Sequence, residues 1–268
     1  SWLPPRVVVL GLAGVLLVAG ALIIRKTEWA QERYLAKLSN HSLSLLAMER
    51  PNDYLVHRTF ATRLYQEGDL EDSIQAFQRS VQINPKDFPS HFGLGVALAD
   101  AGQAHEAERA FVRAVELRPS DPLPHFKLAE LYHRFRNSTS TIEPLTKVTE
   151  LDPENAEAWY RLGMAWGDLH QFDKALSSLE RAARLNPRRA LYLRDLGQVQ
   201  LHFGKSQAAM DSLNRARDID PNDAGTYVVL AETVLASGTS EEQLATAQGY
   251  LNNALKIDPQ YSAALREL

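Results

Sequence analysis

Residues 156–187 read AEAWYRLGMAWGDLHQFDKALSSLERAARLNP, and this stretch decides the fold. Large apolar residues lie in it at helical spacing, at Trp159, Leu162, Trp166 and Leu179. Small residues lie beside them, at Gly163, Ala175 and Ala182, and the stretch ends at Pro187. The small residues let two helices approach each other, and the large ones fill the space between them. A proline closes the second helix, because proline cannot continue a helix. The stretch therefore predicts a pair of packed helices.

The same pattern recurs along the chain. An interval of 34 residues separates each of Pro51, Pro85, Pro119, Pro153, Pro187 and Pro221 from the next, and Pro259 follows after 38. A fixed period of this length indicates a helix–turn–helix repeat. One helix pair cannot bury its apolar face alone, so successive pairs must stack.

Residues 156–187 resemble the tetratricopeptide repeat at each diagnostic position, with Trp166 where tyrosine is usual and Leu179 where phenylalanine is usual. The resemblance covers residues 39–268 and implies an all-α fold, a right-handed superhelix of helix pairs. It predicts six repeats, over residues 54–87, 88–121, 122–155, 156–189, 190–223 and 224–261. A degenerate half-repeat is expected over residues 39–53. Residues 262–268 are expected to begin a capping helix or a further repeat.

Two copies depart from the pattern. The copy over residues 122–155 has Thr141 and Val148 where small residues are expected, and Pro144 lies within its second helix. The last copy has four extra residues after Gly238. There, Thr239 and Glu242 are expected to form a capping box at the start of the second helix.

The N-terminal segment predicts a membrane anchor. Residues 7–24 read VVVLGLAGVLLVAGALII and carry no charge. As a helix they would span about 27 Å, close to the hydrocarbon thickness of a bilayer. We therefore expect one transmembrane helix within residues 1–24, followed by a helical stalk over residues 25–38. A cleaved signal peptide, cut near the small residues 19–21, is the alternative.

Two further expectations concern this anchor. Gly11, Gly14, Val18 and Ala21 form a small-residue stripe that would let a neighbouring transmembrane helix pack closely, although ordinary glycine and alanine content also explains it. The basic residues that follow the apolar run outnumber Arg6 before it. The positive-inside rule then favours repeats on the cytoplasmic side, with the opposite side left open.

Composition excludes several classes of function. The net charge is −4 and no basic block is present, so nucleic acid is not an expected partner. The chain has no cysteine, which removes disulfides, thiolate metal sites and cysteine nucleophiles. His57, His91 and His125 lie 34 residues apart at the place of Trp159, and stacked helices about 10 Å apart cannot bring them to one zinc ion. No catalytic motif, cofactor, metal or small-molecule substrate is predicted.

The candidate site follows from the resemblance, which implies that the first helices of successive repeats line a concave groove. The residue after the Trp159 place would point into it, and Met164 lies one turn further on. The predicted contacts with a partner are Arg58, Phe92, Phe126, Tyr160, Met164 and Arg194. Aromatic residues and arginine are enriched at binding hot spots. The alternative is that these side chains pack against adjacent helices.

Some relatives clamp a terminal carboxylate in this groove. Arg58 and Lys127 match two of the basic positions of that clamp, but Thr62 and Gly93 stand where asparagines would be needed, so a carboxylate clamp is not expected. The sequence therefore favours a non-catalytic scaffold that binds other proteins, as an accessory subunit of a membrane protein complex. A transient assembly factor that holds client peptides in the groove is the alternative. The partner and the pathway are left open.

Overall fold

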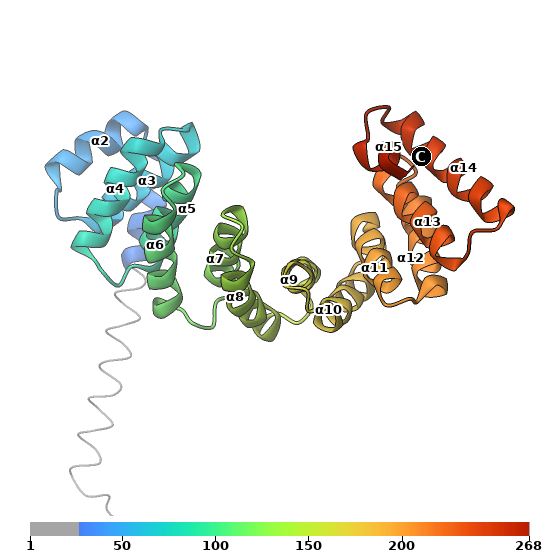
Figure 1. The fold of residues 1–268 in the computed structure, drawn as a ribbon. Helices are drawn as coiled ribbons and strands as arrows, with labels where there is room; N and C mark the ends of the chain where they lie inside the picture. The colour runs from blue at the N-terminus through green and yellow to red at the C-terminus, as the bar shows by residue number, and fades with distance from the viewer. Residues whose placement is uncertain (1–26, 268) are drawn as a thin grey trace, which may run out of the picture. The chain divides into compact units, whose positions relative to one another are not determined.

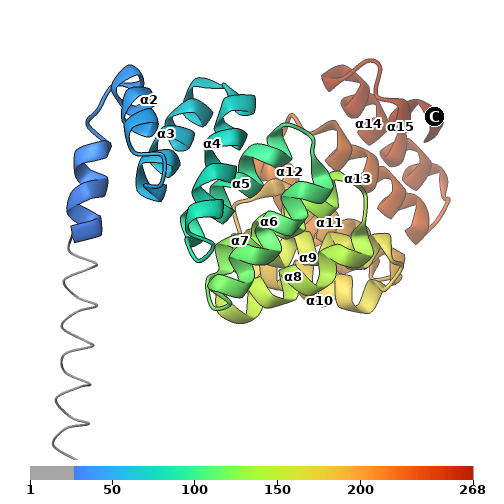
Figure 2. The same cartoon turned by 90° about the vertical axis from the view of Figure 1, so that its left-hand side faces the viewer.

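The computed structural model describes residues 27–267, and every regular element among them is an α-helix (Figures 1 and 2). A first helix covers residues 27–35. The others are α2 (Asn40–Glu49), α3 (Tyr54–Glu67), α4 (Leu70–Ile83), α5 (Phe88–Asp100), α6 (Ala104–Leu117), α7 (Pro122–Arg134), α8 (Ser138–Leu151), α9 (Ala156–Asp168), α10 (Phe172–Leu185), α11 (Ala190–His202), α12 (Ser206–Ile219), α13 (Ala224–Ser237), α14 (Glu241–Ile257) and α15 (Ser262–Glu267).

The predicted transmembrane helix and its stripe of Gly11, Gly14, Val18 and Ala21 lie outside the described residues. Within residues 27–267, no helix combines the length and the apolar composition needed to cross a bilayer. The chain divides into two compact units, one ending at Pro119 and one beginning at Ser120. We refer to them as unit 1 and unit 2.

Each unit is built of helix pairs that stack on one another. Unit 1 contains the pairs α3–α4 and α5–α6, and unit 2 contains α7–α8, α9–α10, α11–α12 and α13–α14. Each pair falls within one of the predicted repeats, and within each unit the second helix of one pair packs on the first helix of the next. Figure 1 shows α7, α9, α11 and α13 on the inner side of the curve of unit 2.

In three of the pairs, a glycine in the first helix lets the two helices approach closely. A Cβ atom on Gly163 would lie 2.8 Å from Cγ of Leu179, and one on Gly197 would lie 2.7 Å from Cγ of Leu213. The equivalent contact in unit 1 joins Gly95 to Phe111. The side chains that meet these glycines are fully buried. This contact is therefore the centre of the core in the pairs α5–α6, α9–α10 and α11–α12.

Most first helices begin at an Asp or Asn that follows the repeat proline by two residues. The side chain accepts a backbone N–H of the first turn at Asp53, Asp87, Asp121 and Asn155. These bonds satisfy donors that have no partner inside the helix. Arg189 occupies the same place before α11, where no side-chain cap forms.

At one repeat position, histidine in α3 and α5 and tryptophan in α9 bond to the carbonyl group of the preceding repeat proline. Nε2 of His57 lies 3.3 Å from the carbonyl oxygen of Pro51, and Nε2 of His91 lies 3.1 Å from that of Pro85. In unit 2, Nε1 of Trp159 donates to the carbonyl of Pro153 over 3.0 Å. Histidine thus takes the linking role of tryptophan.

The described part of the expected stalk packs against the helices that follow it. Leu35, at the end of the helix over residues 27–35, is 1% exposed and shares a core with Leu43, Leu55 and Val56. Ser39 then caps α2 through its side chain. Residues 27–49 therefore form a helix pair that belongs to unit 1.

One local expectation was wrong by a single residue. The capping box of α14 consists of Ser240 and Gln243, and not of Thr239 and Glu242. The extended backbone that precedes the helix is that of Ser240, with φ −63° and ψ 161°. By contrast, Pro144 lies inside α8 as expected, where Thr141 and Val148 are buried.

The glycine contact gives the first prediction. We expect Gly163→Ala to lower the free energy of unfolding by about 1–3 kcal/mol, because the added methyl group overpacks against Leu179 and the carbonyl of Ala175. Gly167→Ala, one turn later in α9, meets no atom within 4 Å and should raise it by about 0.5 kcal/mol through helix propensity. Urea unfolding followed by circular dichroism measures both changes. Equal stability of the two variants would contradict the close packing at Gly163.

The histidine links give a second prediction. Burial lowers the pKa of His57 and His91 below the ordinary value of 6.5, and the proline carbonyls offset this only in part. The unfolded chain therefore takes up protons more readily, so these residues favour folding above pH 6.5 and lose that contribution as the pH falls below it. We expect His57→Gln with His91→Gln to reduce the acid-induced fall in the urea midpoint between pH 7 and about pH 5.

The matched control replaces the exposed residues His41 and His105 with glutamine. This control removes the same number of histidines from solvent-exposed places. It should leave the fall in midpoint close to that of the unchanged chain. If both double variants behave alike, His57 and His91 do not govern the acid sensitivity.

Candidate protein-binding surface

All six predicted contact residues lie on first helices and are partly exposed. In unit 1, Arg58 is on α3 and Phe92 is on α5. In unit 2, the remaining four are on α7, α9 and α11: Phe126, Tyr160, Met164 and Arg194. The structure connects three of the residues in unit 2 through a network of polar contacts and places Met164 beside it.

Two tyrosines bind α9 to α11. The hydroxyl of Tyr160 donates to Oδ2 of Asp195 over 2.7 Å, and the hydroxyl of Tyr192 donates to Oε2 of Glu157 over 2.7 Å. The two rings stack with centroids 4.6 Å apart. Burial, together with the neighbouring carboxylates, raises the pKa of both phenols. Both tyrosines therefore remain protonated donors at neutral pH.

Arg161 extends this network toward α7. Its Nε donates to Glu157 over 2.6 Å, its Nη2 lies 3.3 Å from Glu130, and its guanidinium lies 5.1 Å from the ring centre of Phe126. Burial alone would raise the pKa of Glu157, but the bonds from Tyr192 and Arg161 outweigh it and hold that pKa below its usual range. Arg161 thus packs close to the ring of Phe126, which was expected to contact a partner.

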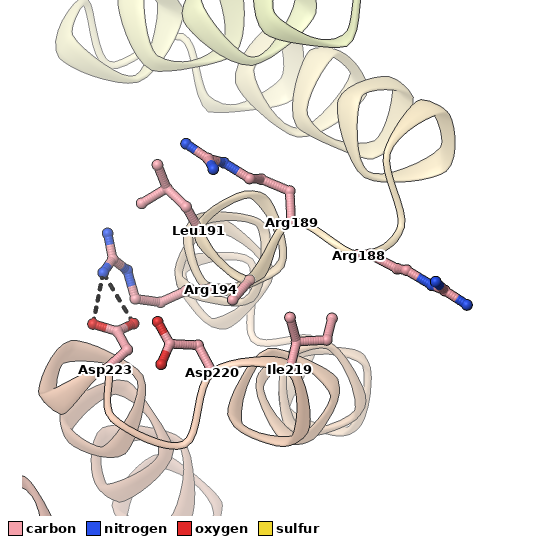
Figure 3. Close-up of a pocket in the computed structure, with 8 residues that line it drawn as sticks. Arg188, Arg189, Leu191, Arg194, Ile219, Asp220 and Asp223 are labelled. Atoms are coloured by element: carbon pink, nitrogen blue, oxygen red, sulfur yellow. Dashed lines mark hydrogen bonds and ion pairs between the residues drawn. The ribbon is translucent and has the colours of Figure 1, made fainter.

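Both predicted arginines make ion pairs within the chain. Nη1 of Arg194 donates to both carboxylate oxygens of Asp223 over 3.1 Å, as Figure 3 shows, and its Nε donates to Asp195 over 3.0 Å. In unit 1, Nη1 of Arg58 donates to Asp87 over 2.8 Å. Each arginine therefore holds one first helix to the N-terminus of the next. A contact of these residues with a partner stays a prediction.

A cavity opens beside Met164, among α9, α10 and α11, with a volume of about 370 Å³. Apolar side chains contribute part of its lining, from Met164, Phe172, Leu179 and Val199. Polar groups also line it, from Asp168, Asp195, Gln198 and His202. Gly163 and Gly167 also line it, and Gly167 leaves room on the α9 side because a Cβ atom there would meet no atom within 4 Å. Such a mixture of apolar and polar lining is typical of a ligand-binding recess.

A second cavity, of about 440 Å³, lies between the start of α11 and the α12–α13 turn. Arg188, Arg189 and Arg194 line it together with Asp220 and Asp223. Figure 3 shows Arg194 facing Asp223, whereas Arg188 points away from them. The positive charges do not converge on one point, so this cavity is not arranged as an anion site.

The sequence did not reveal the network, although a signal for it exists. Tyrosine and carboxylate stand 35 residues apart in Tyr160–Asp195 and in Glu157–Tyr192, and the same spacing joins Tyr65 to Asp100 in unit 1. This spacing is one repeat plus one residue. Among residues 27–267, no group of three or more His, Asp or Glu side chains is placed to hold a metal ion.

Comparison with known proteins identifies the repeats. A family profile described as "Tetratricopeptide repeat" matches residues 92–143 and 167–224, and one described as "TPR repeat" matches residues 61–102. No curated protein matches the chain.

Several solved structures share the fold. The crystal structure of YrrB, "a TPR protein with an unusual peptide-binding site", is 18% identical, with a TM-score of 0.63 over 70% of this chain and 97% of that one. A crystal structure of MamA is 23% identical, with a TM-score of 0.60 over 65% and 93% of the two chains. MamA 41-end from Desulfovibrio magneticus RS-1 is 19% identical, with a TM-score of 0.58 over 63% and 96%. At these identities the solved structures support the fold alone, and the matched profiles show that the chain contains tetratricopeptide repeats.

Proposed function

We propose that this chain is a non-catalytic scaffold that is tethered to a membrane and binds segments of other proteins on the first helices of unit 2. The observation that carries the binding role is the cavity beside Met164, which residues of α9, α10 and α11 line. The similar fold of YrrB is described as having a peptide-binding site. The proposal for this chain rests on its own cavity.

The lining of the cavity favours an apolar anchor residue within an extended segment. Met164, Phe172 and Val199 offer apolar surface for such a side chain. Gln198 and His202 at the cavity are exposed and can hydrogen-bond to the backbone of the segment. The surrounding tyrosine–carboxylate bonds hold α9 and α11 in place before binding, which lowers the entropy lost when a partner docks.

The tether is proposed from the sequence of residues 7–24, which is apolar and long enough to cross a bilayer. The small-residue stripe from Gly11 to Ala21 would suit packing on a partner's transmembrane helix. These two features favour a lasting accessory subunit of a membrane complex over a transient assembly factor. The basic residues after the apolar run favour cytoplasmic repeats.

Site-specific photo-crosslinking tests the binding role. A photoreactive amino acid replaces Gln198 at the cavity or, as a control, Val112, which is exposed on α6. The full chain is then irradiated in the membranes of its host. We expect discrete protein adducts from position 198 in stoichiometric yield, as for a lasting subunit, and none from position 112. Adducts in trace yield would favour the assembly factor instead.

A cavity-filling variant makes this test specific. Gly167→Leu adds a side chain at the cavity where a Cβ meets no atom within 4 Å, and Gly249→Leu adds the same side chain at an equally open place on α14. We expect Gly167→Leu to reduce the yield from position 198 about tenfold, which corresponds to about 1.4 kcal/mol. Gly249→Leu should leave it unchanged. Unchanged adducts with Gly167→Leu would contradict binding in this cavity.

Alkaline extraction and thiol labelling test the tether. The chain has no cysteine, so Leu244→Cys on α14 supplies a single exposed thiol. We expect the chain to stay in the membrane pellet at alkaline pH. A membrane-impermeant maleimide should label Cys at position 244 only after the membrane is permeabilised. Release of the chain into the supernatant contradicts the tether, whereas labelling of sealed cells contradicts only the cytoplasmic orientation.

A further inference from the structure

The helix over residues 27–35 turns its acidic side chains toward the protein. The hydroxyl of Tyr54 donates to Oε1 of Glu28 over 2.8 Å, and Arg58 forms an ion pair with Glu32. On the same face, Gln31 donates to Asp53 over 2.8 Å. Leu35 completes this face in the core of the first helix pair. Both acids of the helix are therefore held by partners in unit 1.

The opposite face of this helix is aromatic and basic. Trp29 is 57% exposed and Tyr34 is 60% exposed. Arg33 and Lys37 are also exposed, and the guanidinium of Arg33 lies 5.3 Å from the ring centre of Trp29. A surface helix in water normally directs apolar residues inward and charged residues outward. Here the acids point inward, and large aromatic rings with bases point outward.

The next helix, α2, adds apolar surface to the same end of unit 1. Leu45 and Met48 lie one turn apart and are 47% and 77% exposed. Nine large apolar side chains are exposed among the described residues, and four of them fall within residues 27–49. The described side chains of α14 and α15 include only Leu244 in this class. The end repeats of such arrays normally present a polar outer face.

We propose that these exposed side chains, those of Trp29, Arg33, Tyr34, Lys37, Leu45 and Met48, together form a face that lies on an anionic lipid surface. Tryptophan and tyrosine prefer the headgroup region, where their rings are half solvated. Basic residues beside them are attracted to anionic headgroups. The apolar run of residues 7–24 ends five residues before Trp29, and Arg25 and Lys26 lie between them. This continuity favours lipid over a second protein as the occupant.

This inference extends the proposed membrane tether, and lipid quenching can test the two separately. Single cysteines replace Tyr34 or Met48 on the proposed face, Leu16 in the apolar run, or Val112 on α6 as a control. Each full-length variant carries an environment-sensitive fluorophore in phosphatidylcholine vesicles, with or without phosphatidylserine. Nitroxide-labelled lipids then report contact with the bilayer. We expect strong quenching at position 16, intermediate quenching at positions 34 and 48 that increases with phosphatidylserine, and none at position 112.

The pattern of quenching separates the outcomes. Quenching at position 16 without quenching at positions 34 and 48 overturns the surface contact and leaves the tether intact. Quenching at positions 34 and 48 without quenching at position 16 supports the surface contact and contradicts the tether. Blue-shifted but unquenched fluorescence at positions 34 and 48 shows that protein covers the face, which also overturns the inference.

Charge reversal supplies an independent test in the same vesicles. Arg33→Glu with Lys37→Glu should at least halve the quenching at position 48, because both bases would become acids. Lys86→Glu with Arg109→Glu makes the same change in net charge at exposed places elsewhere in unit 1. We expect this control to leave the quenching unchanged. An equal effect of the two double variants would show that only net charge matters and would overturn the contact at this face.

Discussion

The structure depends on the close approach of two helices within each repeat. Gly163 and Gly197 have no side chain where Leu179 and Leu213 press against the first helix. A pair joined in this way still has an apolar flank, which only the next pair can cover. Stacking therefore continues along each unit at the period that the prolines mark. The same position in every repeat then meets the same kind of neighbour.

Because of this regularity, some of the predicted contact residues on the first helices also bond one repeat to the next. Arg194 reaches the N-terminus of α13 through Asp223, and Tyr160 reaches α11 through Asp195. Such side chains connect successive repeats, so their exposed parts are held rigidly. Binding specificity then depends on the spaces between the connections. The cavity beside Met164 is such a space, because Gly167 leaves it open on the α9 side.

The sequence predicts the helix pairs well because the period of 34 residues repeats the same packing contact. It predicts single contacts less well, because those depend on how the pairs stack. From the sequence, Leu35 is expected in a stalk. In the structure, residues of α3 help to form the core that buries it. The capping pattern fits Thr239 and Ser240 equally, and only the backbone conformation selects Ser240. The groove positions fall on first helices, but their bonds span 29 or 35 residues and follow from the stack.

The two surfaces proposed for this chain differ in chemistry and lie in different units. The face around Trp29 and Tyr34 exposes flexible basic side chains beside aromatic rings. The face around Tyr160 holds its charges in internal bonds and exposes a recess. Lipid contact at the first would leave Glu28 and Glu32 in their present ion pairs and hydrogen bonds, because these acids face the protein. Binding at one surface changes the affinity of the other only if the protein has two conformations and each ligand binds them with different affinity. Because Glu28 and Glu32 are already bound to Tyr54 and Arg58 of α3, the helix over residues 27–35 is held on the repeat that follows it.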